Sequence, residues 1–315
     1  MMERLLYLTA LALVRLLQAL PLGAVVRVGR CGGALAYIID GRHRNVAVRN
    51  LTNCFGDEKS VVEIKSIARE NFRRLGENYC SAIKTAGMSF AELSRHVEFV
   101  HGERMLPQPG EPGVPSRVVA IGHFGNFELY PRYGQFAPVF QCMSTYRALP
   151  QPSLNRLLQS LREKSGALLF ERRTEASALK AAMNAPGKLL GLLCDQHAGP
   201  NGLRLPFFGH ECSTSSAPAV FALRYHCRLF TGLCFRTAPG KWRLEVGEEI
   251  ATHENGKPRS TAAIMLDVNR AFEAAVRRDP ANWFWVHNRW KAARVTARAE
   301  QTASAEPVQQ TPSRP

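Results

Sequence analysis

The sequence predicts an α/β fold: a mixed, largely parallel sheet covered by helices, preceded by an amino-terminal, membrane-associated helical segment. Two observations predict it. Short β-rich runs alternate with stretches of helical periodicity through most of the chain, which is typical of parallel strands joined by helices. The first forty residues contain a long apolar segment. A chain of 315 residues that is 45% hydrophobic can bury the core that such a fold requires.

The amino-terminal apolar segment, "LLYLTALALVRLLQALPLGAVV" at residues 5–26, approaches the length that spans a bilayer. Arg15 and Gln18 interrupt it, and Pro21 breaks a helix. A charge near the centre of a spanning helix costs about 2.5–3.5 kcal/mol on insertion scales. We therefore expect an uncleaved anchor that either spans the bilayer or lies in its interface. The alternative is a buried amphipathic helix of the globular fold.

Basic residues and a helical pattern follow this segment. Arginines at 27, 30, 42, 44 and 49 place the bulk of the protein on the cytoplasmic side of a membrane, by the positive-inside rule. Residues 58–87, "EKSVVEIKSIARENFRRLGENYCSAIKTAG", repeat apolar side chains at helical spacing and end at a glycine. They predict a long helix in an amino-terminal helical layer.

The remainder alternates predicted strands with predicted helices. The strands are "RVVAIG" (117–122), "PVFQCMS" (138–144), "GALLF" (166–170), "KLLGLLC" (188–194) and "RLFTGLCF" (228–235). The helices between them are expected at residues 127–136, 152–165, 174–185 and 215–227. Since no repeat or break in composition divides this region, we expect an anchor at 1–40, one α/β domain at 41–293 and a disordered tail at 294–315.

The net charge of the chain indicates which kinds of partner it binds. Lysine and arginine number 41 against 26 acidic residues, a net charge of +15, so the surface should attract an anion. The basic residues form no arginine-rich block or nucleic-acid-binding motif, which favours lipid headgroups or an acidic carrier protein over nucleic acid.

The eight cysteines lie in apolar segments, as expected of buried thiols in a reducing compartment. Cys194 and His197, followed by His210 and Cys212, have some likeness to a zinc site. Only one residue separates His210 from Cys212, which is closer than the usual spacing of zinc ligands, so no metal site is expected.

One stretch, "VVAIGHFGNFELY" at residues 118–130, carries candidate chemistry. It sets His123 at the carboxyl end of a predicted strand, where open α/β sheets place their active sites. Glu128 follows five residues later. Because residues five apart do not share a helix face, the two side chains can meet only if His123 lies in a loop and Glu128 in the first turns of a helix.

Glycine and asparagine at the junction suit that geometry. Gly122 and Gly125 tolerate unusual dihedral angles, and Asn126 is a favoured helix cap. The pattern predicts a dyad in which the Glu128 carboxylate orients His123. The other imidazole nitrogen would then remove a proton from a substrate hydroxyl.

The "GHFGNFE" stretch resembles the H-x4-D/E motif of glycerolipid acyltransferases. The chain as a whole resembles the bacterial lipid A biosynthesis late acyltransferase family, also called lauroyl/myristoyl acyltransferases. Glutamate in the motif and "LPFFG" at residues 205–209 favour that branch over the broader glycerolipid enzymes. The other matching blocks are "YRAL" (146–149), "LREKSG" (161–166), "CDQHAGPNGLRLPFFG" (194–209) and "WFWVHNRWK" (283–291).

The resemblance implies an O-acyltransferase at the cytoplasmic face of the bacterial inner membrane. It would move a fatty acyl chain from an acyl carrier protein thioester to a hydroxyl of a lipid A precursor or related anionic glycolipid. His123 would be the general base and Glu128 its partner, with no cofactor beyond the acyl-carrier thioester as co-substrate.

The resemblance also implies roles for further residues. Arg162 of "LREKSG" matches a position assigned to the oxyanion or to donor binding, and Asp195 would support the site. Arg147 and Arg204 are candidates for binding substrate phosphate, because guanidinium groups match phosphate oxygens. For the aromatic residues at 283–285 and 290, core packing is favoured over an acyl groove or a membrane interface.

Two other functions remain open. One is acyl transfer from acyl-CoA to a phospholipid or a mannosylated phosphoinositide, since the family resemblance extends to such enzymes. The other is a basic membrane- or nucleic-acid-binding protein without enzymatic activity, which rests on the net charge alone.

Overall fold

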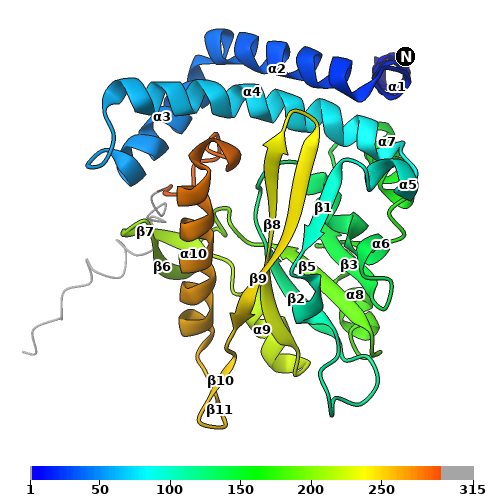
Figure 1. Cartoon of the computed structure of the whole chain (residues 1–315), viewed down its shortest axis with the longest axis vertical. Helices are drawn as coiled ribbons and strands as arrows, with labels where there is room; N and C mark the ends of the chain where they lie inside the picture. Colours follow the sequence, from blue (N-terminus) through cyan, green and yellow to red (C-terminus); the bar gives the residue numbers. More distant parts are fainter. Residues whose placement is uncertain (1, 292–315) are drawn as a thin grey trace, which may run out of the picture.

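The computed structural model describes residues 2–291, so the tail predicted at 294–315 lies outside the described residues. A seven-stranded sheet forms the centre of the molecule (Figure 1). Its strands, in spatial order, are β1 (Val97–Val100), β9 (Lys241–Ile250), β8 (Arg228–Ala238), β2 (Arg117–Ile121), β5 (Lys188–Leu193), β3 (Gln141–Tyr146) and β4 (Leu168–Glu171). The predicted mixed, largely parallel sheet is confirmed.

Strand direction divides the sheet into two parts. From β8 to β4 every neighbouring pair is parallel, whereas β9 is antiparallel to β8 and β1 is parallel to β9. The carboxyl ends of β2 and β5, which are adjacent strands, therefore lie side by side at one edge. The β-rich runs at 117–122, 138–144, 166–170, 188–194 and 228–235 all coincide with strands of this parallel part.

Helices cover both faces and one end of the sheet (Figure 1). The α-helices are α1 (Met2–Ala19), α2 (Leu22–Ile39), α3 (Gly41–Phe55), α4 (Val61–Ala86), α5 (Phe90–Leu93), α6 (Tyr133–Phe136), α7 (Pro152–Glu163), α8 (Ala176–Ala182), α9 (Ala217–Arg224) and α10 (Thr261–Arg278). The 3₁₀ helices within the described residues are η1 (Gly102–Met105), η2 (Phe127–Arg132) and η3 (Pro280–Asn282). Two short hairpins are formed by β6 (Leu203–Phe207) with β7 (His210–Thr214) and β10 (His253–Glu254) with β11 (Lys257–Pro258).

The long helix predicted at 58–87 is α4, and its ends follow the sequence signals. Ser60 and Glu63 form a capping box, which satisfies backbone N–H groups of the first turn, and Gly87 is the carboxyl cap. Figure 1 shows α4 lying across one end of the sheet, beneath α2. The tip of the β8–β9 hairpin reaches the same helix, because the backbone N–H of Gly240 donates to the Glu77 carboxylate. Because that tip follows the carboxyl end of β8, α4 covers the edge where the parallel strands end.

The amino-terminal apolar segment forms two helices rather than one, with Pro21 between α1 and α2. Among the described residues, only α2 is long and apolar enough to cross a membrane by length and composition. It lies along α4 with very close backbone approach: a Cβ on Gly29 would be 2.5 Å from the Gly76 carbonyl oxygen, and a Cβ on Gly33 would overlap the Phe72 carbonyl.

Side chains of the central strand β2 alternate between two cores, as the two-residue period of a strand requires. Val118 and Ala120 belong to the larger hydrophobic cluster, which includes residues of α9 and α10. Val119 and Ile121 belong to the second cluster, on the face of η2 and α6. With both faces covered, β2 is fully buried, and the functional side chains can emerge only at its end.

Candidate active site

His123 and Asp195 meet at the carboxyl edge of the sheet. Ile121 and Leu193 are Cα partners at the ends of β2 and β5. His123 and Asp195 each lie two positions beyond one of these strand ends, so they lie side by side. The Asp195 carboxylate accepts a hydrogen bond from the backbone N–H of His123 at 2.7 Å and lies 2.7 Å from its imidazole Nδ1. This double contact fixes both the loop and the ring of the histidine.

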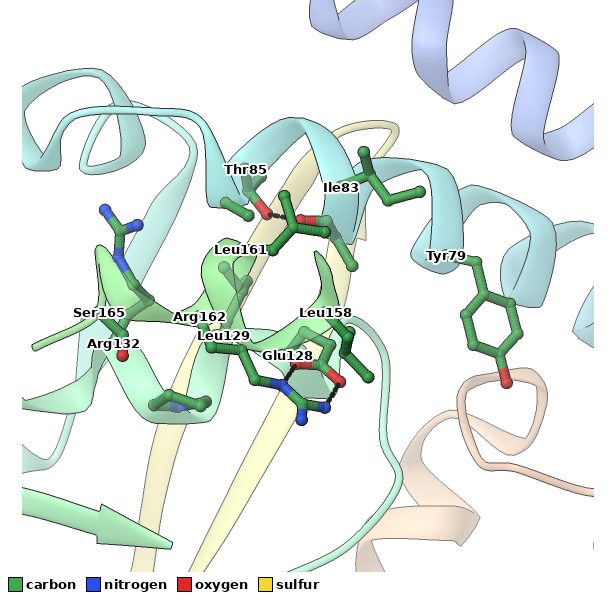
Figure 2. Close-up of a pocket in the computed structure, with 13 residues that line it drawn as sticks. Tyr79, Ile83, Thr85, Glu128, Leu129, Arg132, Leu158, Leu161, Arg162 and Ser165 are labelled. Carbon is green, nitrogen blue, oxygen red and sulfur yellow. Dashed lines mark hydrogen bonds and ion pairs between the residues drawn. The ribbon is translucent and has the colours of Figure 1, made fainter. Parts of the chain in front are cut away.

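The predicted contact between His123 and Glu128 is wrong. Glu128 lies on η2 and is bound by the Arg162 guanidinium, whose Nε and Nη2 donate to the two carboxylate oxygens at 2.9 and 2.5 Å (Figure 2). After the loop, the chain turns through Gly125, at φ +50°, into a 3₁₀ helix. That turn directs Glu128 toward α7, on which Arg162 lies, and leaves Asp195 as the carboxylate partner of His123.

Asp195 is buried, with 2% of its surface exposed, and remains suited to carry a charge. Burial raises its pKa, but the charge and hydrogen bonds of His123 and the indole N–H of Trp283, 2.8 Å away, lower it further, so the net pKa lies below its usual value. An ionised carboxylate can only accept hydrogen bonds, so His123 carries its proton on Nδ1. Its Nε2 is therefore free to accept a proton.

Two glycines make this loop possible. A Cβ on Gly122 would lie 2.6 Å from the Phe124 ring and 3.3 Å from the Asp195 carboxylate. Gly125 adopts a left-handed conformation, and a Cβ there would lie 2.6 Å from the Cys234 carbonyl oxygen. Asn126 occupies the cap position before η2, as expected, but its side-chain amide donates to Thr85 of α4 and makes no cap hydrogen bond.

Aromatic and amide groups lie around the imidazole of His123. The rings of Phe127 and Phe284 lie 4.9 and 5.6 Å from that of His123, centroid to centroid. The side-chain amide nitrogen of Gln196 lies 3.4 Å from Nε2. Nearby, burial lowers the pKa of His287 to about 4, although the Asp195 carboxylate opposes that shift. His287 is thus neutral, and its Nε2 accepts the backbone N–H of His197.

An apolar cavity of about 300 Å³ lies beside this site, between α4, η2 and α7 (Figure 2). Side chains such as Ile83, Leu158 and Leu161 form much of its wall, and Glu128 and Arg162 also line it. A smaller cavity, which the Phe127 side chain lines, shares the Glu128–Arg162 ion pair with the larger one. The ion pair therefore lies between an apolar cavity and the surroundings of His123.

The comparison with known proteins identifies the family. A sequence model described as bacterial lipid A biosynthesis acyltransferase matches residues 2–292, nearly the whole chain. The chain belongs to the bacterial lipid A biosynthesis acyltransferase family. It is 26% identical over 280 residues to the lipid A biosynthesis palmitoleoyltransferase of Escherichia coli strain K12, with 86% of each chain covered. The same figures relate it to the lipid A biosynthesis acyltransferase of Shigella flexneri.

The other predicted site residues of this lipid A acyltransferase lie in different settings. Arg147 follows β3 at the same sheet edge and is exposed. Arg204 lies on the β6–β7 hairpin and is paired with Glu211. Within residues 2–291 no three His, Cys, Asp or Glu side chains gather as metal ligands. The roles assigned to His123, Glu128, Arg162, Asp195, Arg147 and Arg204 stay predictions.

Some residues near His123 were not singled out by the sequence analysis. Gln196 and His287 lie close to His123, and Trp283 donates to Asp195. The prediction that the closing aromatic residues pack in the core is confirmed for Trp283 and Trp285, which are 1% and 0% exposed. A signal for Gln196 was present, since it directly follows Asp195 in the "CDQH" block.

Proposed function

We propose that this acyltransferase moves a fatty acyl chain from an acyl carrier protein thioester to a hydroxyl of a lipid A precursor, with His123 as general base. The observation that carries the proposal is the His123–Asp195 pair. Asp195 contacts Nδ1 at 2.7 Å from a buried position, and this leaves Nε2 as the proton acceptor. Such a base is what a sugar or acyl-chain hydroxyl needs in order to attack a thioester.

The chemical step follows from these contacts. Nε2 of His123 removes the proton as the acceptor hydroxyl attacks the thioester carbonyl carbon, and Asp195 stabilises the imidazolium that forms. The tetrahedral intermediate collapses by breaking the carbon–sulfur bond, and the imidazolium returns its proton to the departing thiolate. A general base of this kind contributes about 10²–10⁴ in rate. Because a thioester is already activated, the reaction requires no acyl-enzyme.

The apolar cavity supports a role in holding hydrocarbon. Its volume is about 300 Å³, and the side chains of Leu129, Leu158 and Leu161 line it. Burying each methylene of an acyl chain there contributes about 0.8 kcal/mol. We propose that the acyl chain occupies this cavity, with the Glu128–Arg162 pair forming its polar wall on the side of His123.

The exposed faces of α1 and α2 support a membrane setting. They present large apolar side chains to solvent: Met2, Leu5, Leu6, Leu8, Leu13, Leu16, Val28, Leu35, Ile38 and Ile39. Arg27 lies in α2, and Arg42 and Arg49 lie in the next helix, α3. We propose that this apolar face enters the cytoplasmic leaflet of the inner membrane, with the arginines meeting anionic headgroups.

A reconstituted transfer assay tests the proposal. The protein in lipid nanodiscs is given an acyl carrier protein thioester and a lipid A precursor, and mass spectrometry follows the acylated product. The His123→Ala variant should lose transfer by about 10²–10⁴, whereas His253→Ala, an exposed histidine on β10, should match the unaltered protein. Transfer that survives His123→Ala would contradict the mechanism. Parallel reactions with acyl-CoA, and with phospholipid as acceptor, separate the alternative donor and acceptor.

A further inference from the structure

We propose that Gln196 is a catalytic residue whose side-chain amide donates a hydrogen bond to the oxyanion of the tetrahedral intermediate. This inference rests on the proposed acyl transfer. In this account, a neutral amide beyond the end of β5 stabilises the negative charge that develops on the thioester oxygen. The guanidinium expected from the "LREKSG" block would not fill that place.

The position of the amide relative to His123 is the first argument. Gln196 Nε2 lies 3.4 Å from His123 Nε2, longer than the ~2.9 Å of a usual hydrogen bond. Since Asp195 holds the proton of His123 on Nδ1, Nε2 presents a lone pair, and the amide N–H is the group that faces it. The hydroxyl oxygen that approaches Nε2 and the thioester oxygen that becomes the oxyanion are bonded to the same carbon in the tetrahedral intermediate, so a base and an oxyanion donor must lie close together, as these two nitrogens do.

The second argument is that the backbone of Gln196 is held rigidly. Its carbonyl oxygen accepts a hydrogen bond at 2.9 Å from Arg289, a side chain that is 1% exposed and is also bound by Ser213 and Thr214. The next backbone N–H, of His197, donates to His287 at 3.0 Å. Fixing the backbone limits the positions that the side-chain amide can take, and a donor that is preorganised in this way lowers the cost of reorganisation when charge develops.

The third argument is that other nearby donors are already bonded. The backbone N–H of His123 donates to Asp195, that of Phe124 to the Gly122 carbonyl, and that of Gly125 to the Asn282 carbonyl. A backbone oxyanion hole formed by these three groups is thereby excluded.

Two of the three nitrogens of the Arg162 guanidinium are bonded as well. Its Nε and Nη2 both donate to Glu128. In contrast, the only partner of the Gln196 amide nitrogen among the described side-chain hydrogen bonds is Nε2 of His123, the atom that the substrate hydroxyl must approach.

The test compares Gln196→Met, which keeps the length of the side chain but has no N–H, with Gln196→Asn, which withdraws the amide by one methylene. Gln151→Met, at an exposed position before α7, is the matched control. We expect the first two variants to lower kcat by about 10²–10³, the loss typical of one oxyanion donor, with KM nearly unchanged. The control should keep the kcat of the unaltered protein.

Two ligands separate an oxyanion donor from a residue that only positions His123. A phosphonate that carries the acyl chain imitates the tetrahedral intermediate, whereas a thioether analogue imitates the bound donor. Gln196→Met should weaken phosphonate binding by the same factor as kcat/KM and leave thioether binding and the pH profile of kcat unchanged. A kcat within about threefold of the unaltered protein, or a loss of kcat without a loss of phosphonate affinity, would overturn the inference.

The same reactions distinguish this inference from the proposed function. If His123→Ala also retains transfer, the general-base mechanism fails, and phosphonate affinity in Gln196→Met still reports on the amide. If His123→Ala is inactive while Gln196→Met is active, only the role of Gln196 fails.

Discussion

Asp195 contacts the imidazole of His123 from a strand end 72 residues further along the chain. The pairing of Ile121 with Leu193 in two parallel strands is sufficient to bring them together. The glutamate of the H-x4-E motif makes no hydrogen bond to the histidine among the described residues. It instead forms a bidentate ion pair with Arg162 beside an apolar cavity.

Glu128 and Arg162 should act as a unit. Both side chains are about one-fifth to one-quarter exposed, so removing either leaves the other partly buried without its partner. We expect Glu128→Gln and Arg162→Gln each to lower transfer, and the double variant to be no worse than the poorer single one. A double-mutant cycle on kcat/KM measures this coupling. Losses that multiply in the double variant would show that the two residues act independently.

His287 should make the protein less stable in mild acid. Its pKa is about 4 in the folded chain against a usual value of 6.5, so below pH 6.5 the unfolded state takes up a proton that the folded state does not. Stability should therefore fall as the pH is lowered from 6.5 to 4, by about 2 kcal/mol once solvent screening is allowed for. Thermal unfolding of His287→Gln should show a flatter profile over that range, whereas His253→Gln should keep the slope of the unaltered protein.

The glycines between α2 and α4 should be intolerant of side chains, and the same helix supplies a control. Gly29→Ala places a methyl group 2.5 Å from the Gly76 carbonyl oxygen, so the two helices must separate. Gly32 has no atom within 4 Å of its ideal Cβ. We expect Gly29→Ala to destabilise by about 1–3 kcal/mol, and Gly32→Ala to be neutral or stabilising by up to ~1 kcal/mol. Equal unfolding temperatures for the two variants would contradict this packing.

Membrane binding should depend on the apolar face of α1. Leu13 and Leu16 are 52% and 57% exposed, and each loses about 1.5–3 kcal/mol of transfer free energy if it leaves an apolar phase. Leu13→Glu with Leu16→Glu should lower the fraction bound to anionic vesicles at least tenfold, as measured by flotation. Val220→Glu, on α9 and away from α1 in Figure 1, serves as the control. Undiminished flotation of the α1 variant would rule out this face as the anchor.

Local structure could be predicted from the sequence more accurately than contacts between segments that lie far apart in the chain. The strand end at His123, the glycines of its loop and the capped helix α4 all follow from local patterns. The partner of His123 does not, because it depends on β5 lying next to β2, and β3 and β4 intervene in the chain. The spacing to Glu128 predicted a local contact, but the 3₁₀ turn directed that side chain toward Arg162.

The break at Pro21 was visible in the sequence, whereas the packing of α2 was not. Gly29 and Gly33 are ordinary residues of an apolar segment until Gly76 and Phe72 of α4 are brought against them. Gln196 follows Asp195 in the "CDQH" block, but its proximity to His123 depends on the β2–β5 register.

The rate of acyl transfer by the Asp195→Asn variant tests the central claim most directly. Asparagine keeps the shape of the side chain but does not favour the Nδ1–H form of His123 or stabilise its imidazolium. Single-turnover transfer in lipid nanodiscs should slow by about 10³–10⁴, while the folded fraction at neutral pH stays high. A variant that transfers the acyl chain at nearly the unaltered rate would show that Asp195 does not hold the base.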